Sequence, residues 1–117
     1  MFKRENRLIA SVRFNNSYSF SVPQFVLKER ENGLLLNRFG IVVSKKIDKR
    51  AVVRNKIKRI FRDALLNLNK NMVSGHDILF IAKTGILSKK KEEMHLVIKS
   101  ALEKTGLMKM ISDKWKM

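Results

Sequence analysis

The side chains best suited to chemistry in this sequence are cations grouped in one segment. From Lys49 to Arg62, lysine and arginine recur without an intervening aspartate or glutamate. Like charges three or four residues apart on a helix destabilise it unless an anion compensates them. Ammonium and guanidinium groups bind phosphate well. The segment therefore predicts phosphate binding, and the alternative is an ordinary solvated helix surface, although such surfaces mix both signs of charge.

Residues for catalysis or metal binding are scarce. His76 and His95 are the only imidazoles, and they lack the spacing of a metal motif. Glu92 and Glu93 would point about 100° apart on a helix, so they do not form a general acid and base pair. The sequence has no cysteine, which excludes a disulfide, a thiolate zinc site and a cysteine nucleophile. We predict no catalytic residue and no metal ligand in the chain.

Net charge indicates the kind of partner. The 117 residues carry 26 Lys and Arg against 10 Asp and Glu, a formal charge of +16. A domain this basic is typical of nucleic-acid binders. The longest strongly apolar stretches, 39–43 and 78–82, are far shorter than the roughly 20 residues of a membrane-spanning helix, and the first residues lead into no secretory apolar core. We expect one domain over residues 1–117, no membrane partner and, with no cysteine, a cytoplasmic location.

Hydrophobic patterning predicts three strands. Residues 20–28 surround Pro23, the only proline, and suggest an edge strand because proline cannot donate to a sheet ladder. Residues 29–33 are then a turn. Residues 34–44 and 77–83 are rich in β-branched and aromatic side chains and read as buried strands.

Helical periodicity predicts two helices. Residues 49–68 have apolar side chains at helical spacing over several turns, and residues 89–104 follow the same rule with Ser88 as cap and Gly106 as terminator. Residues 107–117 suggest a short or frayed C-terminal helix. The order strand, strand, helix, strand, helix predicts an α+β fold in which helices pack on a small mixed sheet. The strands and helices would form a split βαβ arrangement.

The first helix separates its charges from its apolar residues. On a wheel of about 100° per residue, one side carries Arg54, Asn55, Lys56, Lys58, Arg59 and Arg62. The other side carries Val53, Ile57, Ile60, Phe61, Ala64, Leu65 and Leu68. The helix thus has an apolar back and a cationic front. Lys45 and Lys46, at the end of the preceding strand, widen the cationic patch.

The end of the second predicted strand and the first predicted helix together form a specific sequence motif. Val43-Ser44-Lys45-Lys46, followed by residues 51–62 with their Arg-Asn-Lys and Lys-Arg steps, resembles the signature of the bacterial ribonuclease P protein family. Residues 6–8, 24–27, 38–43 and 75–78 resemble further family segments, so about two thirds of the chain aligns in order. Lys56 differs, because many members have a second arginine there, which keeps the charge but loses bidentate contact.

This resemblance implies a fold and a function. In the family, the basic helix joins two parallel strands by a left-handed crossover, where general rules favour a right-handed one. It also implies a protein subunit of ribonuclease P that binds the catalytic RNA and the 5′ leader of precursor tRNA and assists magnesium-dependent leader removal. Magnesium is expected at the RNA active site, with no cofactor held by the protein. The chain alone would be inactive and would require no protein partner.

The resemblance also implies two RNA-binding surfaces. The helix motif would face ribonuclease P RNA, through Lys45, Lys46, Arg50, Arg54, Asn55, Lys56, Lys58, Arg59 and Arg62. A cleft would bind the single-stranded leader through Phe14, Tyr18 and Lys28. Aromatic rings stack on any base, which suits leaders of variable sequence, although both rings could equally be core residues. Lys28 stands where family members often have a tyrosine, and residues 15–22 are shorter than in the family pattern.

Two other functions remain as alternatives. A ribosomal or other structural RNA-binding protein would share the basic helix and the fold, but it would need no single-strand cleft, so its binding should not depend on leader length. A protein nuclease acting alone would need clustered carboxylates or histidines. The dispersed aspartates, Asp48, Asp63, Asp77 and Asp113, disfavour the nuclease.

Overall fold

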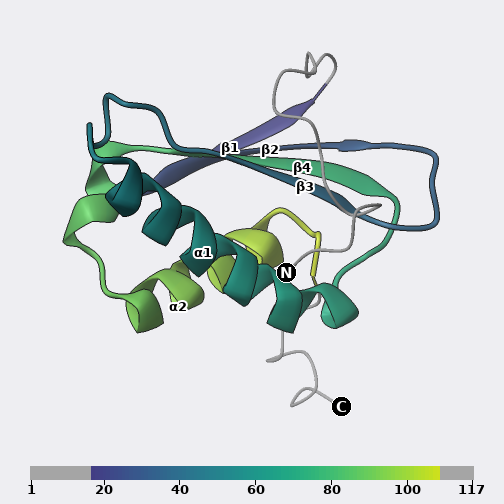
Figure 1. The fold of residues 1–117 in the computed structure, drawn as a ribbon. Helices are drawn as coiled ribbons and strands as arrows, with labels where there is room; N and C mark the ends of the chain where they lie inside the picture. Colours follow the sequence, from purple (N-terminus) through teal and green to yellow (C-terminus); the bar gives the residue numbers. More distant parts are fainter. Residues whose placement is uncertain (1–16, 109–117) are drawn as a thin grey trace.

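The computed structural model describes residues 17–108, in which two helices cover one face of a four-stranded sheet (Figure 1). The strands are β1 (Tyr18–Ser21), β2 (Phe25–Glu31), β3 (Arg38–Val42) and β4 (His76–Ala82). The helices are α1 (Ala51–Leu68) and α2 (Lys91–Lys104), with 3-10 turns η2 (Asn69–Asn71) and η3 (Thr84–Ser88). The predicted α+β fold with a small mixed sheet is confirmed.

The sheet has the order β1-β2-β4-β3. β2 pairs antiparallel with β1 and β4, whereas β3 and β4 are parallel and are joined through α1. A split βαβ unit would have a strand between its parallel pair. Here β3 and β4 are direct neighbours, so the βαβ unit is not split, and β2 lies on the far side of β4. The left-handed sense of the crossover stays a prediction from the family resemblance.

The prediction of one edge strand over residues 20–28 is wrong. The segment forms a hairpin in which β1 and β2 are joined by a turn containing Pro23, closed by a 2.9 Å hydrogen bond from Val22 N–H to Phe25 O. Proline lacks the N–H that a ladder needs, so it interrupts the run and permits two strands. β2 is consequently a central strand, and it continues to Glu31 through most of the predicted turn.

The strand predicted over residues 34–44 is shorter than expected. β3 spans only Arg38–Val42 and lies at the edge of the sheet. Its core-facing residue Phe39 is buried, while Leu34 and Leu35 are exposed in the loop before the strand. An apolar run cannot by itself distinguish a strand from an exposed apolar loop, because both have the same composition.

Three aromatic rings anchor α1 to the sheet. Phe61 of α1 lies with its ring centroid 5.6 Å from Phe25 of β2 and 5.2 Å from Phe80 of β4, and Phe25 and Phe80 are 5.3 Å apart. All three are fully buried. Such contacts add about 0.5–1.5 kcal/mol per pair beyond the area that they bury. They fix the face of α1 that meets the core, and so the face that remains outside.

The helix ends differ in part from prediction. α2 begins at Lys91, and Lys90 N–H donates to Glu93 Oε1 at 3.0 Å, while Ser88 Oγ donates to Gly85 O within η3. Ser88 is therefore not the cap. Gly106 is confirmed as terminator, since its φ of 79° favours glycine and Leu107 N–H donates to Leu102 O. The helix predicted over 107–117 lies mostly outside the described residues.

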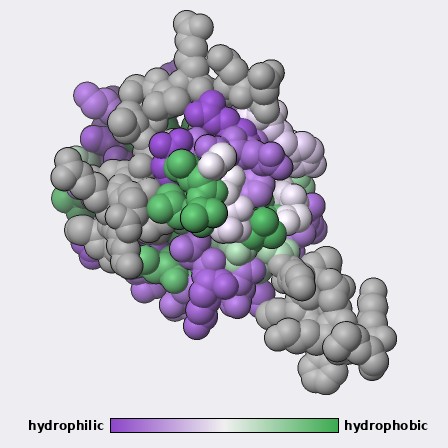
Figure 2. All heavy atoms as spheres, turned by 90° about the vertical axis from the view of Figure 1, so that its right-hand side faces the viewer, coloured by the Kyte–Doolittle hydropathy of each residue, from purple (hydrophilic) through white to green (hydrophobic). Residues whose placement is uncertain are grey.

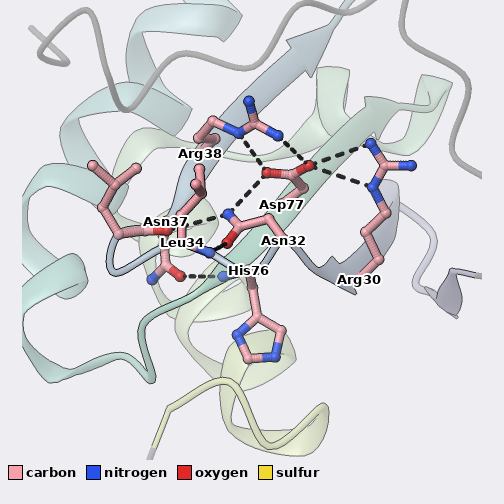
Figure 3. A network of polar contacts seen from close by, with 8 residues as sticks. Arg30, Asn32, Leu34, Asn37, Arg38, His76 and Asp77 are labelled. Carbon is pink, nitrogen blue, oxygen red and sulfur yellow. Dashed lines mark hydrogen bonds and ion pairs between the residues drawn. The ribbon is translucent and has the colours of Figure 1, made fainter.

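A buried carboxylate joins three strand ends. Asp77, 1% exposed, accepts hydrogen bonds from Arg38 Nε at 2.7 Å, from Arg30 Nε and Nη2 at 3.3 Å, and from Asn32 Nδ2 at 3.0 Å (Figure 3). Burial raises the pKa of Asp77, but the hydrogen bonds from Arg38, Asn32 and Arg30 and the charge of Arg38 outweigh it and lower the pKa below its usual range. Beside it, Asn37 Nδ2 donates to Val73 O at 2.9 Å and its Oδ1 accepts from His76 N–H.

We expect Asp77→Asn to lower the free energy of unfolding by about 3 kcal/mol at neutral pH, because both arginines lose their buried counter-charge. The folded-state pKa lies below the unfolded value of about 3.9, so the carboxylate stabilises the fold above that value and loses this effect as pH falls through the folded pKa. Urea unfolding at pH 7 and in acid measures both effects. Asp63→Asn, which removes a half-exposed carboxylate, is the control, and a variant of Asp77 as stable as the parent at pH 7 would contradict the role of Asp77.

Close packing at the other end of the sheet gives a second prediction. A Cβ on Gly85 would lie 2.3 Å from the carbonyl oxygen of Pro23. Gly85→Ala should therefore separate η3 from the β1–β2 turn and cost about 1–3 kcal/mol. Thermal unfolding measures the loss, with the neighbouring exposed Thr84→Ala as control. An unchanged melting temperature would show that the turn can move away freely.

Candidate nucleic-acid interface

The outer face of α1 is cationic, as predicted. Ile57, Phe61, Ala64, Leu65 and Leu68 are buried against the sheet, with Val53 and Ile60 partly buried beside them. On the side away from the core, Asn55, Lys56 and Arg59 are exposed, while Arg54, Lys58 and Arg62 are partly exposed. The wheel is thus confirmed for both faces.

The cationic surface continues onto the turn before α1. Lys45 and Lys46 are exposed in a turn closed by a hydrogen bond from Ile47 N–H to Ser44 O at 3.0 Å. Ile47 packs on the core and so anchors this turn. The two lysines follow the end of β3, and Arg59 lies in the middle of α1. Packing of both segments on the core fixes their relative positions.

Two of the predicted cations also support the start of the helix. Asp48 accepts hydrogen bonds from the Arg50 N–H at 2.8 Å and from Arg50 Nε at 3.1 Å. These hydrogen bonds from Arg50 and its charge hold the pKa of Asp48 below its usual range. Arg54 Nη1 donates to the carbonyl oxygens of Asp48 and Lys49 at 3.0 and 2.8 Å. Arg50 is therefore partly neutralised, and the charge available to a partner lies mainly on the lysines and on Arg59 and Arg62.

Electrostatics do not favour this helix in isolation. Its first turn has no acidic residue and its last turn no basic one, so the helix lacks the charges that the helix dipole prefers at its two ends. Asp63 forms a pair with Lys91 of α2 at 3.6 Å, but both side chains are about half exposed, so the pair contributes little. Apolar packing holds α1 in place, and an anion along its outer face would relieve the repulsion.

The predicted leader cleft is not a single surface. Phe14 lies outside the described residues. Tyr18 is opposite Glu29 in the β1–β2 ladder, and Ser19 is opposite Lys28. Paired residues share a face and successive residues alternate, so Tyr18 and Lys28 point to opposite faces of the sheet. Lys28 lies on the face without helices, and Tyr18, 54% exposed, lies on the helix-covered side at the edge of the sheet.

Sequence reasoning missed the charged residues around Asp77. Arg30, Asp77 and Arg38 form one row across the sheet, because Asp77 is the ladder partner of both arginines. They share the face of Lys28, by alternation along β2. The period of two along each strand was a usable signal, but the strand order that brings the row together was not readable from the sequence.

The described part of the chain offers little for catalysis. Within residues 17–108, no group of three or more His, Asp or Glu side chains could hold a metal ion. His76 Nε2 lies 3.7 Å from a Glu29 carboxylate oxygen, an isolated pair. No helix in this range is long and apolar enough to cross a membrane. The fold and the cationic surface define a small α+β nucleic-acid-binding protein.

Comparison with known proteins gives the family. A sequence model of the family described as Ribonuclease P matches residues 2–106. The ribonuclease P protein component of Clostridium botulinum (strain 657 / Type Ba4) is 35% identical over 109 residues, covering 89% of this chain and 97% of the relative. That of Pseudomonas entomophila is 37% identical over 99 residues, covering 80% and 74%.

Solved structures agree with this assignment. The RNase P protein of Staphylococcus aureus has a TM-score of 0.73 at 28% identity, covering 81% of this chain and 86% of that one. The RNase P protein of Thermotoga maritima has a TM-score of 0.61 at 29% identity, covering 80% and 84%. The chain therefore belongs to the bacterial ribonuclease P protein family, and it serves as a subunit in tRNA processing.

The cationic face should act in binding and not in folding. Replacing Arg59 and Arg62 by alanine should change the free energy of unfolding by under about 0.5 kcal/mol per site, since both lie away from the core. Affinity for RNA should fall, and the slope of log affinity against log salt should flatten by roughly 1.4–1.8. Lys99→Ala with Lys104→Ala on α2 removes equal charge elsewhere and is the control. A large drop in melting temperature would instead make the two arginines structural.

Proposed function

We propose that this chain binds ribonuclease P RNA through the outer face of α1 and assists that RNA in removing the 5′ leader from precursor tRNA. The observation that carries the proposal is the continuous cationic surface of α1 and the preceding turn, on the side of the helix opposite the buried Phe61. Such a surface matches a sugar–phosphate backbone, whose phosphates supply a large share of the affinity in binding to nucleic acids. Family membership supports the choice of RNA.

In this proposal the RNA performs hydrolysis and the protein supplies no catalytic group. Magnesium at the RNA active site would supply the chemistry there, activating a bound water as the nucleophile and stabilising the charge that develops on phosphate. Lysine and arginine side chains screen neighbouring phosphates, so the RNA can fold and bind magnesium at a lower concentration. The protein requires no cofactor and no protein partner of its own, and it works in the cytoplasm.

Leader binding is a separate part of the proposal. Lys28 lies on the sheet face without helices, where its ammonium group is the candidate for contact with leader phosphates. Phe14 and Tyr18 remain the aromatic candidates for stacking on leader bases. Because Tyr18 and Lys28 lie on opposite faces, at most one of them can line the same surface as Phe14. A ribosomal or structural RNA-binding role would involve no leader contact.

Reconstitution tests the central claim. The full chain mixed with a bacterial ribonuclease P RNA should cleave precursor tRNA at a magnesium concentration where the RNA alone is slow, because the cations of α1 replace part of the screening by magnesium. Protein alone should cleave nothing. Cleavage rates across a magnesium series, with Arg59→Ala/Arg62→Ala as the comparison, measure the effect. Equal rates with and without protein, or cleavage by the protein alone, would refute the proposal.

A further inference from the structure

The loop between β2 and β3 presents two apolar side chains to solvent. Leu34 is 45% exposed and Leu35 is 96% exposed. We call these two residues the leucine tip. Figure 2 looks onto this end of the molecule, where apolar side chains stand among polar ones. Single exposed leucines are common in soluble proteins, so exposure by itself does not indicate a binding site. The hydrogen bonds and charges around the loop are the further evidence.

The loop is held in one conformation. Asn32 Oδ1 accepts the Leu34 N–H at 2.8 Å, Asn32 Nδ2 donates to Leu36 O at 3.2 Å, and Asn32 N–H donates to Gly75 O at 2.9 Å. Gly33 has a φ of 71°, which permits the turn. Asn32 Nδ2 also donates to the buried Asp77 (Figure 3). Leu35 therefore projects from a fixed loop, which reduces the entropy lost when it meets a partner.

Cations flank the loop on both strands. Arg30 of β2 and Arg38 of β3 both bond to Asp77, and their side chains are 24% and 35% exposed. Glu31 also ends β2 but points to the opposite face from Arg30. On the face of Arg30 and Arg38, two arginines against one aspartate leave a net positive charge beside the leucine tip. The same carboxylate thus fixes two guanidinium groups and, through Asn32, the apolar loop between them. This combination suits a partner that presents phosphate beside an apolar surface.

The small area of the leucine tip limits what can cover it. A stable protein interface buries roughly 1,000 Å² or more, far beyond two leucine side chains, and a second copy of a chain with charge +16 would also be repelled. The contact must therefore belong to a larger interface formed elsewhere. An unstacked RNA base offers a flat apolar face next to its own phosphates. RNA held by α1 is the partner that fits.

We infer that the leucine tip is a second contact with ribonuclease P RNA, in which Leu35 packs on the face of an unstacked base and Arg30 and Arg38 lie beside its phosphates. This rests on the proposed binding of that RNA by α1. The leucine tip precedes β3 and Lys45 follows it, so the two contacts lie at opposite ends of a strand roughly 17 Å long. Binding of one RNA at both ends of β3 raises the affinity, because the second contact forms within a complex that already exists.

The test measures the affinity of the full chain for a bacterial ribonuclease P RNA across a salt series. Leu35→Ser should weaken binding about tenfold, through lost burial of apolar surface, with an unchanged salt slope, since no cation is removed. Leu35→Phe should retain or increase affinity, because a ring also stacks on a base. Leu87→Ser changes a half-exposed leucine in η3, beyond the far end of β4, and is the control that should bind like the parent.

Circular dichroism checks that each variant is folded, and Leu35→Gln repeats the comparison if serine alters the melting temperature. The inference is overturned if Leu35→Ser or Leu35→Gln binds like the parent, or if Leu35→Phe loses as much affinity as Leu35→Ser. Sedimentation that shows a parent dimer dissociated by Leu35→Ser would assign the leucine tip to a second copy and would also overturn the inference.

Arg59→Ala/Arg62→Ala separates the two proposals. If that variant binds weakly while Leu35→Ser binds normally, only the leucine tip fails, whereas a parent that does not bind the RNA refutes the proposed function.

Discussion

The contact among Phe25, Phe61 and Phe80 is the interaction on which the rest of the structure depends. It joins β2, α1 and β4 in one fully buried cluster. A helix with so many like charges and so few compensating acids has little stability of its own. The aromatic cluster supplies the packing that keeps α1 on the sheet, and with Phe61 fixed inward, Arg59 and Arg62 must turn away from the core. One apolar contact thereby stabilises the fold and orients the cationic face.

Asp77 sets the second constraint, at the end of the sheet where β4 begins. Its carboxylate faces two arginines and Asn32, so a single buried charge fixes the ends of β2 and β3 and the loop between them. A buried ion pair is costly to assemble and more costly to break. Its presence at the base of an exposed loop ties the geometry of that loop to the integrity of the sheet. The molecule thus has the leucine tip at one end of the sheet and a broad cationic surface on its helical layer.

In the proposed binding of ribonuclease P RNA, these two features make different contributions. Phosphate contacts provide affinity and depend on salt, but they carry no information about where along the RNA the protein sits. Apolar contact with a base depends little on salt and requires an unstacked nucleotide, so it can set the register. In the proposed function, the protein contributes through such positioning and through phosphate screening, and the packed sheet and helices hold the two contacts at a fixed distance.

The sequence by itself determined the α+β class, both helices, the cationic face of α1 and the family. Each of these is local: the period of Ile57, Phe61 and Leu65 identifies a buried helix face without knowledge of what it meets. The sequence did not reveal that Pro23 divides two strands, that β3 lies at an edge, or that Tyr18 and Lys28 point to opposite faces. Only the tertiary structure decided these points, and only it brought Arg30, Arg38 and Asp77 into one row. The reason is physical, since strand order and register depend on pairing between segments far apart in the chain, and a shift by one residue exchanges the faces of a strand.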